Sequence, residues 1–376
     1  MELIASCAFG LEKLVHDELK QLGLWTIKTE DGRITFTGDQ AAIVKSNLWL
    51  RCAERVQIKM AEFTAVTFDQ LFDTVNALEW EKYIGKDDAF PNTATSVKSV
   101  LHSEPAIQSI VKKAMVKRLQ QKHQSEILSE NSGIIYQIFV KGNKDRFVIS
   151  INTSGDSLHK RGYRIMANLA PMKETLAAAI IKLSDWTPER RLVDTFCGSG
   201  TIAIEATMIA NNIAPGLRRR FAFQKWPWMD QQLILKAFEE ARNAINPVEK
   251  LPIYCFDIDP ETLAIAQENA HRAGFEKINF KRADFNDLDF RKFENCTFIV
   301  NPPYGERLEE KAVVAKMYRD FGKKFAESKK CSLFLITSNE NFPALFGRPA
   351  DKNRKLFNGN LRCYLYSYFA KGTTKM

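Results

Sequence analysis

The second half of the sequence, from about residue 170 onward, alternates short apolar segments with longer segments of helical periodicity. This alternation favours a mostly parallel, doubly wound sheet with helices on both faces. Parallel strands have their carboxyl ends at one edge of the sheet, where ligands bind, and the crossovers between them are expected to be right-handed. The sequence therefore predicts an α/β, Rossmann-like domain here. The expected strands are the apolar runs at 191–196, 252–259, 278–284, 296–303 and 331–338.

The first half of the sequence mixes strands and helices. Residues 132–152 show two alternating strand patterns around a GNKD turn, and residues 104–123 show the spacing of an amphipathic helix. These patterns predict an α+β module of one or two small units. The polar, glycine-containing segment 154–164 is the expected link to the second half.

The charge and the cysteine pattern narrow the class of protein. The formal net charge is +9, which favours a polyanionic partner such as nucleic acid, although a merely basic enzyme would look the same. Seven scattered cysteines without a CxxC pair, and five histidines without metal-ligand spacing, predict buried thiols and no structural metal. The N-terminus does not resemble a signal peptide, and no stretch is apolar enough to span a bilayer, so we expect a cytoplasmic protein.

A glycine-rich turn follows the first expected strand of the second half. Gly198, Gly200 and Ala203 fit the G-x-G-x-x-A pattern of dinucleotide-binding turns, which is a weak signal by itself. Asp194 ends the strand before the turn, where a carboxylate would repel a pyrophosphate but attract the sulfonium and ammonium groups of S-adenosylmethionine. The next strand-end acid, Asp257, comes 57 residues after Gly200 (257 minus 200), whereas a dinucleotide fold expects it about 20 residues on. The pattern favours a methyl donor over NAD or FAD.

Other residues near the strand ends complete the expected donor site. Asp257 is the candidate acceptor for the ribose hydroxyls, and Asp259, which starts the next helix, is the less favoured alternative. Asp284 follows a third strand and could accept from the adenine amine or cap a helix. Cys197 and Thr201 belong to the glycine-rich turn and the helix after it, so both are candidate donor contacts, with Cys197 acting as a small packing residue.

The sequence Asn-Pro-Pro-Tyr at 301–304 follows an apolar run. Alone it indicates a rigid turn, because proline fixes φ and removes a backbone donor. Next to a bound methyl donor, this turn could take part in methyl transfer to an amine. The side-chain oxygen of Asn301 and the carbonyl of Pro302 can accept the two protons of an exocyclic base amine and so free its lone pair. Pro302 and Pro303 would hold these acceptors still, and Tyr304 offers a ring on which an extruded base can stack.

Two basic segments are candidates for contact with RNA. Between residues 98 and 123, six basic residues accompany a single acid, and the alternative is an ordinary solvated helix face. Segment 214–228 interleaves basic with aromatic side chains, which suits single-stranded or loop RNA. Its alternative is that the aromatic rings pack this insertion onto the domain. The candidate RNA-binding residues are Lys112, Lys113, Arg118, Arg218, Arg219, Arg220 and Trp226.

Taken together, these motifs resemble those of one family, the THUMP-domain RNA methyltransferases, and specifically the bacterial 23S rRNA guanine-N2 methyltransferases of the RlmL type. The resemblance extends over nearly the whole chain, because the N-terminal part is similar to a ferredoxin-like segment followed by a THUMP domain. It is carried by SLHKRGYR at 157–164, APMKETLAAAII at 170–181, DTFCGSGTIAIEA at 194–206, FDIDP at 256–260, NPPYGERL at 301–308, LRCAERV at 50–56 and SVKSVLHSEPAIQSIVKKA at 96–114.

The resemblance implies three domains: a ferredoxin-like segment at 1–55, a THUMP RNA-binding domain at 56–160 and a Rossmann-like class I methyltransferase domain at 161–376. It also implies S-adenosylmethionine as cofactor and RNA as partner, either 23S rRNA or its assembly intermediate. The Asn-Pro-Pro-Tyr turn would meet the target amine, with Pro171 and Met172 over the cofactor pocket. The residues expected to line that pocket are Asp194, Gly198, Gly200, Asp257 and Asp284.

Three readings of the function remain open from the sequence. The leading hypothesis is methylation of an exocyclic base amine in RNA, guanine N2 in large-subunit rRNA. Adenine-N6 methylation of DNA or RNA is the first alternative, because DNA adenine methylases and the glutamine methylases of release factors share the Asn-Pro-Pro-Tyr motif. An RNA-binding assembly factor with a vestigial donor site is the second, and the intact donor motifs argue against it.

Overall fold

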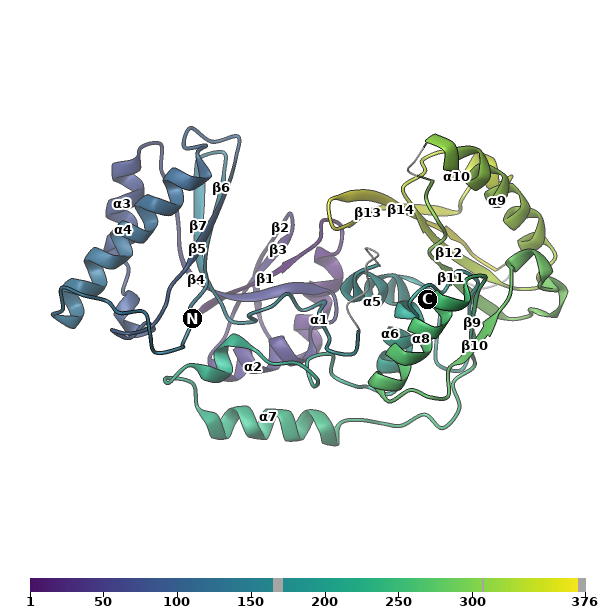
Figure 1. Ribbon diagram of the computed structural model, residues 1–376, viewed down its shortest axis with the longest axis horizontal. Helices are drawn as coiled ribbons and strands as arrows, with labels where there is room; N and C mark the ends of the chain where they lie inside the picture. Colours follow the sequence, from purple (N-terminus) through teal and green to yellow (C-terminus); the bar gives the residue numbers. More distant parts are fainter. Residues whose placement is uncertain (165–171, 306–307, 371–376) are drawn as a thin grey trace.

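The computed structural model describes residues 1–164, 172–305 and 308–370. These residues form two seven-stranded sheets that lie side by side in an elongated molecule (Figure 1). The first sheet belongs to the N-terminal half and the second to the C-terminal half. The first has the order β2-β3-β1-β4-β7-β6-β5 and the second the order β10-β9-β8-β11-β12-β14-β13.

The N-terminal sheet is continuous. Its longest strand, β4 (Ala53–Thr64), pairs with β1 on one side and with β7 on the other, so the boundary expected between residues 55 and 56 falls inside a strand. The other strands are β1 (Glu2–Cys7), β2 (Thr26–Glu30), β3 (Arg33–Thr37), β5 (Asn92–Val97), β6 (Ile138–Asn143) and β7 (Arg146–Asn152). The helices are α1 (Glu12–Gln21), α2 (Gln40–Trp49), α3 (Phe68–Ala77) and α4 (Glu104–His123), with a 3-10 turn at Trp80–Lys82.

Local sequence explains two of these elements. Helix α4 starts where Ser103 accepts a hydrogen bond from the Ala106 amide, and Pro105 occupies the first turn, where its missing donor is not needed. The β6–β7 turn passes through Lys144 and Asp145, both with positive φ, as the GNKD sequence predicts for a tight hairpin.

The C-terminal sheet has the doubly wound topology expected from the alternation of strands and helices, which confirms the predicted fold class. The chain runs from β8 outward to β9 and β10, returns to β11 on the other side of β8, and continues to β12. These five strands are parallel, and β14 is antiparallel to β12 and β13. The strands are β8 (Arg191–Asp194), β9 (Ile253–Asp257), β10 (Asn279–Arg282), β11 (Cys296–Val300), β12 (Ser332–Thr337), β13 (Lys352–Asn358) and β14 (Leu361–Tyr368).

Helices cover both faces of the C-terminal sheet. One face, including Leu192 and Ile299, packs into the core that contains α5 and α6, and the other, including Phe298 and Val300, packs against α9 and α10. The helices are α5 (Glu174–Leu183), α6 (Thr201–Ala210), α7 (Gln231–Asn243), α8 (Pro260–Ala273), α9 (Leu308–Ala326) and α10 (Phe342–Phe346). Short 3-10 turns lie at Ala222–Lys225, Phe285–Asp287 and Phe290–Lys292.

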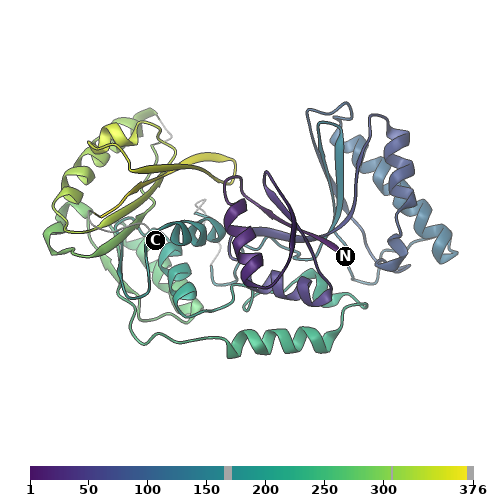
Figure 2. The same cartoon turned by 180° about the vertical axis from the view of Figure 1, so that it is seen from behind.

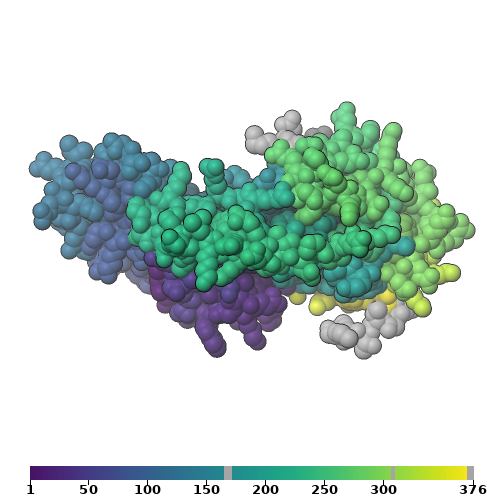
Figure 3. All heavy atoms as spheres, turned by 90° about the horizontal axis from the view of Figure 1, so that it is seen from below, coloured from purple at the N-terminus to yellow at the C-terminus, as the bar shows by residue number. Residues whose placement is uncertain are grey.

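Two segments of the C-terminal half reach back to the N-terminal half. Helix α7 packs against α2, and the chain around it lies across the N-terminal module when the molecule is seen from below (Figure 3). The β13–β14 hairpin extends from the C-terminal sheet toward α1 and the β2–β3 hairpin (Figure 2). All seven cysteines are buried free thiols. Within the described residues, no helix is long and apolar enough to cross a membrane.

Candidate active site

The candidate site lies where the topology of the C-terminal sheet reverses direction. Strands β8 and β11 are parallel neighbours, with Phe298 opposite Val193, so the residues that follow each strand emerge at the same edge. Asp194 ends β8, and Asn301 comes directly after β11. The crossovers after β8 and β11 leave this point in opposite directions, and in doubly wound sheets this is the position at which ligands bind.

The glycine-rich turn after β8 is held by the end of the neighbouring strand β9. Asp257 accepts a hydrogen bond from the Gly198 amide at 2.8 Å and from the Asp259 amide at 3.0 Å. The amide of Cys197 donates to the Phe256 carbonyl at 3.0 Å, and Cys197 itself is buried. A carboxylate has about four acceptor positions, so these bonds leave Asp257 able to accept from a ribose.

The two glycines of the turn differ in their surroundings. Both have positive φ, 52° at Gly198 and 77° at Gly200. A Cβ at Gly198 would meet no described residue within 4 Å, whereas a Cβ at Gly200 would lie 3.2 Å from both Ala266 and Phe280. Gly200 therefore permits close packing at the start of α6, and Gly198 borders open space in which a ligand can lie.

The acid that ends β8 is buried and incompletely paired. Asp194 is 1% exposed; one of its oxygens accepts from the Phe196 amide at 3.1 Å, and the other has no hydrogen-bond partner among the described residues. Burial raises its pKa to about 8, and the charge of Asp257 adds to the shift. The neighbouring hydroxyl of Thr195 is also buried without a described partner. Unsatisfied buried polar atoms are costly, so they fit a site completed by a cationic ligand such as the expected donor.

Two residues that the sequence analysis did not select join this site. Arg164 donates to the Thr201 hydroxyl at 2.6 Å and to the Met172 carbonyl at 3.1 Å, and its guanidinium lies 3.4 Å from the carboxylate of Glu174. Glu174 is 2% exposed, keeps one oxygen without a described partner, and has its pKa raised by burial. In the sequence, Glu174 was visible only as an acid in the first turn of the KETLA helix, where an acid usually serves to stabilise the helix end.

The Asn-Pro-Pro-Tyr turn is held from two directions. The phenol of Tyr304 donates to the side-chain oxygen of Asn301 at 2.6 Å. Tyr318, on α9, donates to the Pro303 carbonyl at 3.0 Å and lies 2.8 Å from the Thr337 hydroxyl at the end of β12. The sequence did not predict that Tyr304 orients the carboxamide. The proposed roles of Asn301 and the Pro302 carbonyl as amine acceptors stay predictions.

Segment 214–228 packs inward, contrary to part of the RNA-binding prediction. Trp226 is fully buried and stacks on Tyr136 with ring centroids 4.8 Å apart, so its ring cannot receive a base. Arg219 donates to four backbone carbonyls in residues 154–160, at 2.6 to 3.3 Å. For these two residues the packing alternative is correct, because the insertion joins the two halves of the molecule. Arg218 donates to the Arg272 carbonyl but remains exposed, as does Arg220.

The basic face of α4 is also partly used within the protein. Lys112 pairs with Glu130 and lies 3.5 Å from the centre of the Phe90 ring. Arg118 pairs with Glu81, the guanidinium Nε donating at 3.0 Å. These contacts weaken the case for both residues as RNA ligands, whereas Lys113 is exposed and remains a candidate.

The remaining candidates have mixed outcomes. Asp284 accepts from the Asn286 amide at 2.9 Å and caps a 3-10 turn, as the alternative reading allowed, so contact with adenine stays a prediction. Met172 is buried beside Arg164, while Pro171 lies outside the described residues. Among the described residues, no group of three His, Cys, Asp or Glu side chains is placed to hold a metal ion.

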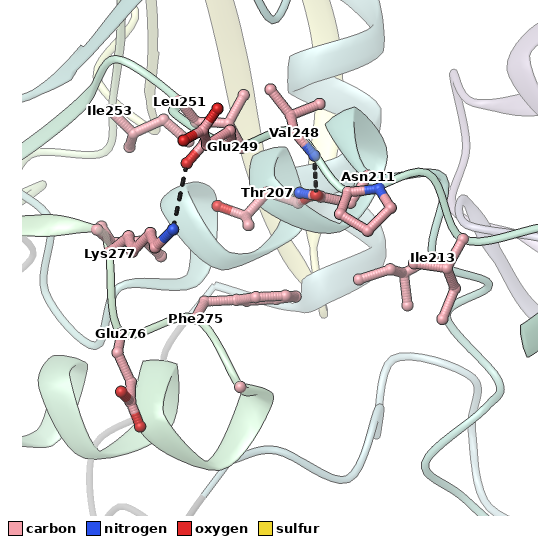
Figure 4. A pocket seen from close by; sticks show the side chains of 14 residues that line it. Thr207, Asn211, Ile213, Val248, Glu249, Leu251, Ile253, Phe275, Glu276 and Lys277 are labelled. Carbon is pink, nitrogen blue, oxygen red and sulfur yellow. Dashed lines mark hydrogen bonds between the residues drawn. The ribbon is translucent and has the colours of Figure 1, made fainter.

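A cavity of about 360 Å³ lies away from this edge (Figure 4). It is bounded by the end of α6, the start of β9 at Ile253 and the segment after α8 around Phe275. Asn211 is turned toward the backbone there and accepts from the Val248 amide at 2.7 Å. Since Ile253 is at the amino end of its strand, the cavity lies at the edge of the sheet opposite the candidate active site.

Comparison with known proteins agrees with this geometry. Three family profiles match consecutive parts of the chain: the RlmL ferredoxin-like domain at residues 2–57, the THUMP domain at 65–152 and the UPF0020 family, described as RMKL-like methyltransferase domain, at 161–367. The last profile matches more than half of the chain.

Individual relatives agree with these profiles. The "Putative RNA methyltransferase YpsC" of Bacillus subtilis (strain 168) is 43% identical over 98% of this chain and 96% of its own length. A "Ribosomal RNA large subunit methyltransferase K/L" of Psychromonas ingrahamii is 34% identical over 96% of this chain, which spans 49% of that longer protein.

A solved structure supports the same assignment. The crystal structure of "SMU.472, a putative methyltransferase complexed with SAH" is 43% identical, superposes with a TM-score of 0.92 and matches 99% of both chains. With the profiles and relatives above, this shows that the chain belongs to the UPF0020 family of RMKL-like methyltransferases, with an RlmL-type ferredoxin-like domain and a THUMP domain before the methyltransferase domain.

Proposed function

We propose that this protein transfers a methyl group from S-adenosylmethionine to an exocyclic amine of a base in RNA, and specifically to guanine N2 in large-subunit rRNA. The observation that carries the proposal is the placement of Asp194 and Asn301 at adjacent carboxyl ends of β8 and β11. One strand end suits a cationic donor, and the other offers fixed acceptors for an amine.

The donor site is supported by the chemistry of the residues present. The oxygen of Asp194 that has no partner among the described residues suits a cation, Asp257 suits the ribose hydroxyls, and Gly198 borders open space. S-adenosylmethionine supplies an electrophilic methyl group on a sulfonium. The relative described as complexed with SAH supports the same ligand, since SAH is the donor without its methyl group.

The acceptor site is supported by the way Asn301 is held. Its side-chain oxygen already receives the Tyr304 phenol at 2.6 Å, and an amide oxygen has a second lone pair for a base amine. The carbonyl of Pro302 is the second acceptor. When both accept, the amine nitrogen becomes more tetrahedral and its lone pair more nucleophilic, while the prolines keep the acceptors in place without reorganisation. Transfer then depends on alignment and needs no covalent intermediate.

RNA as the substrate is supported by the THUMP and RlmL-type domains that the profiles match, and by the net charge of +9. The K/L relatives named as large-subunit rRNA methyltransferases favour rRNA, although the chain spans about half of their length. Adenine N6 is the second candidate, because acceptors placed for one planar amine suit the other equally well.

The test is nucleoside mass spectrometry of rRNA and tRNA from a strain that lacks the protein. Loss of N2-methylguanosine from large-subunit rRNA, restored by the wild-type gene but not by Asn301→Ala, is the expected result. Loss of N6-methyladenosine instead would move the target to adenine. An unchanged set of nucleosides, together with no transfer to RNA by the purified protein, would overturn the proposal.

A further inference from the structure

The β13–β14 hairpin projects past the edge of the sheet that holds the candidate site. The last residue of β12, Thr337, pairs with Tyr364, so the strand residues Leu361 to Cys363 extend beyond the carboxyl end of β12. Their β13 partners, Leu356 to Asn358, extend with them. Three residues at about 3.3 Å each give an overhang of roughly 10 Å. The hairpin tip therefore stands on the same side as the Asn-Pro-Pro-Tyr turn.

The overhanging tip is anchored at its sides. A Cβ on Gly10, which has a φ of 89°, would lie 2.8 Å from the Lys355 carbonyl, so the two backbones approach closely. Arg354 also donates to the Gly10 carbonyl at 3.2 Å. At the tip, the side chain of Asn358 accepts from the Lys173 amide at 3.4 Å, next to the first residue of α5. The hairpin thus bridges the ferredoxin-like domain and the border of the donor site.

One face of this bridge carries alternating basic and aromatic side chains, which we call the hairpin stripe. Because Lys355 pairs with Tyr364, and Phe357 with Arg362, these four side chains share a face of the hairpin. Lys355 lies 5.6 Å from the centre of the Phe357 ring, and Arg362 lies 5.7 Å from that of Tyr364. The hairpin stripe consists of Phe9, Lys355, Phe357, Arg362 and Tyr364.

The hairpin stripe continues onto the ferredoxin-like domain. Phe9 meets Phe357 edge to face with centroids 6.1 Å apart, and it remains 46% exposed. Lys355 and Arg362 are exposed, while Phe357 and Tyr364 are half-buried. Glu340 supplies the neighbouring negative charge: it pairs with Arg362 and accepts from the Tyr364 phenol at 2.7 Å. Arg362 is therefore held at the surface by a partner that a phosphate can replace.

The chemistry of this surface fits one kind of ligand. Rings that are exposed or half-exposed offer stacking faces to unpaired bases, and cations beside them meet the phosphates between those bases. An exocyclic amine in a paired base is not accessible to the Asn-Pro-Pro-Tyr turn, so the target base must be unpaired, and in a single-stranded segment its neighbours are unpaired as well. We propose that the hairpin stripe binds the single-stranded RNA that flanks the target base and guides that base to Asn301. This inference rests on the proposed function.

The test uses the full-length protein with Lys355→Gln and Arg362→Gln combined, and separately with Phe357→Ala. A matched control, Lys236→Gln with Arg291→Gln, removes two charges that are at least 73% exposed at other places. Binding of a fluorescent single-stranded RNA is measured at several salt concentrations. Methylation kinetics are measured with the rRNA substrate, and binding of S-adenosylmethionine is measured by calorimetry.

For the charge variant we expect weaker RNA binding and a salt slope reduced by about 1.4, which corresponds to two single-strand phosphate contacts. For Phe357→Ala we expect a KM for RNA raised about tenfold or more, which matches the loss of one stacked base. In both variants donor binding should be unchanged, and the control should behave as the wild type.

The outcomes separate the two proposals. Suppose that the wild-type protein methylates RNA and that every stripe variant has the same RNA affinity, salt slope and KM as the wild type. This result would overturn the role of the hairpin stripe and leave the proposed function standing. If the wild type methylates no RNA, the proposed function fails. The binding measurement then still decides whether the hairpin stripe contacts single-stranded RNA.

Discussion

At the scale of single residues, the chemistry of the candidate site depends on how completely each polar atom is paired. Asp194 combines full burial with one oxygen that has no hydrogen-bond partner in the described part of the chain, so its protonation should respond to the ligand. Asn301 is in the opposite condition, because Tyr304 already fills one acceptor position and sets the orientation of its carboxamide. We therefore expect Asp194 to bind a positive charge and Asn301 to fix the position of the amine.

The raised pKa of Asp194 predicts that donor binding depends on pH. With a pKa of about 8, the unliganded side chain is protonated at neutral pH, whereas a bound cation favours the carboxylate. Affinity for S-adenosylmethionine should therefore increase from about pH 6 toward pH 8, by up to tenfold per unit, and then level off. Calorimetry in buffers of different ionisation enthalpy should show proton release. Asp194→Asn should bind more weakly and without this dependence; a wild-type affinity that is flat with pH would contradict the account.

The Tyr304–Asn301 hydrogen bond predicts a graded effect on catalysis. Asn301→Ala should abolish methyl transfer and leave donor binding intact. Tyr304→Phe keeps the ring but removes the donor to Asn301, and losing a hydrogen bond of about 1.4 kcal/mol should lower kcat about tenfold. Single-turnover kinetics with saturating donor measure this step. If Tyr304→Phe transferred at the wild-type rate and Tyr304→Ala did not, stacking alone would explain the tyrosine.

At the scale of elements, the two glycines of the glycine-rich turn meet two different requirements, close packing and space for a ligand. Gly200 opens α6 in a left-handed conformation and lies against Ala266 and Phe280, so it serves packing. Gly198 faces space that no described residue fills, so we expect it to serve the ligand. The spacing of the two glycines predicted the turn, but only the packing around them distinguishes their roles.

This difference predicts opposite results for matched substitutions in the turn. Gly200→Ala adds a crowded methyl group to the cost of positive φ and should reduce the free energy of unfolding by about 2–4 kcal/mol. Gly198→Ala adds only the backbone cost, about 1–2 kcal/mol, but should weaken donor binding because its methyl group enters the open space. Urea unfolding and calorimetry measure the two effects. Equal loss of stability with unchanged donor binding in both variants would refute the distinction.

At the scale of the whole molecule, the two halves are joined by a buried ion pair as well as by the hairpin and α7. Arg161, in the polar link, lies 3.4 Å from Glu205 on α6 and donates to the carbonyls of Arg51 and Leu158. Both charged groups are almost fully buried. Arg51 in turn donates to the Ile213 carbonyl at 2.9 Å, which ties the end of α2 to the segment after α6. The link segment 154–164 is thus fixed to both halves of the molecule, and we call it the joint.

From this buried ion pair we predict a large loss of stability when Glu205 is replaced. Glu205→Ala removes the carboxylate that pairs with the buried guanidinium of Arg161 and should reduce the free energy of unfolding by about 3–5 kcal/mol. Glu205→Gln retains an acceptor and should lose less. Glu240→Ala, at an exposed acid on α7, is the control and should stay within about 0.5 kcal/mol of the wild type. Denaturant unfolding measures all three, and a Glu205→Ala variant as stable as its control would disprove the joint.

The sequence by itself determined the fold class, the strand ends and the family, because these depend on hydrophobic periodicity and on short motifs such as the turn at 198–200 and the Asn-Pro-Pro-Tyr turn. Only the tertiary structure decided which basic and aromatic residues are available. Trp226 and Arg219 fit an RNA-binding pattern, but Trp226 is buried, and the guanidinium of the half-buried Arg219 is bonded to backbone carbonyls of the link. Arg362, which is exposed, and Phe357, which is half-buried, attracted no notice in the sequence. A sequence pattern reports only the residue types within one segment, whereas the burial of a residue depends on which distant segments fold over it.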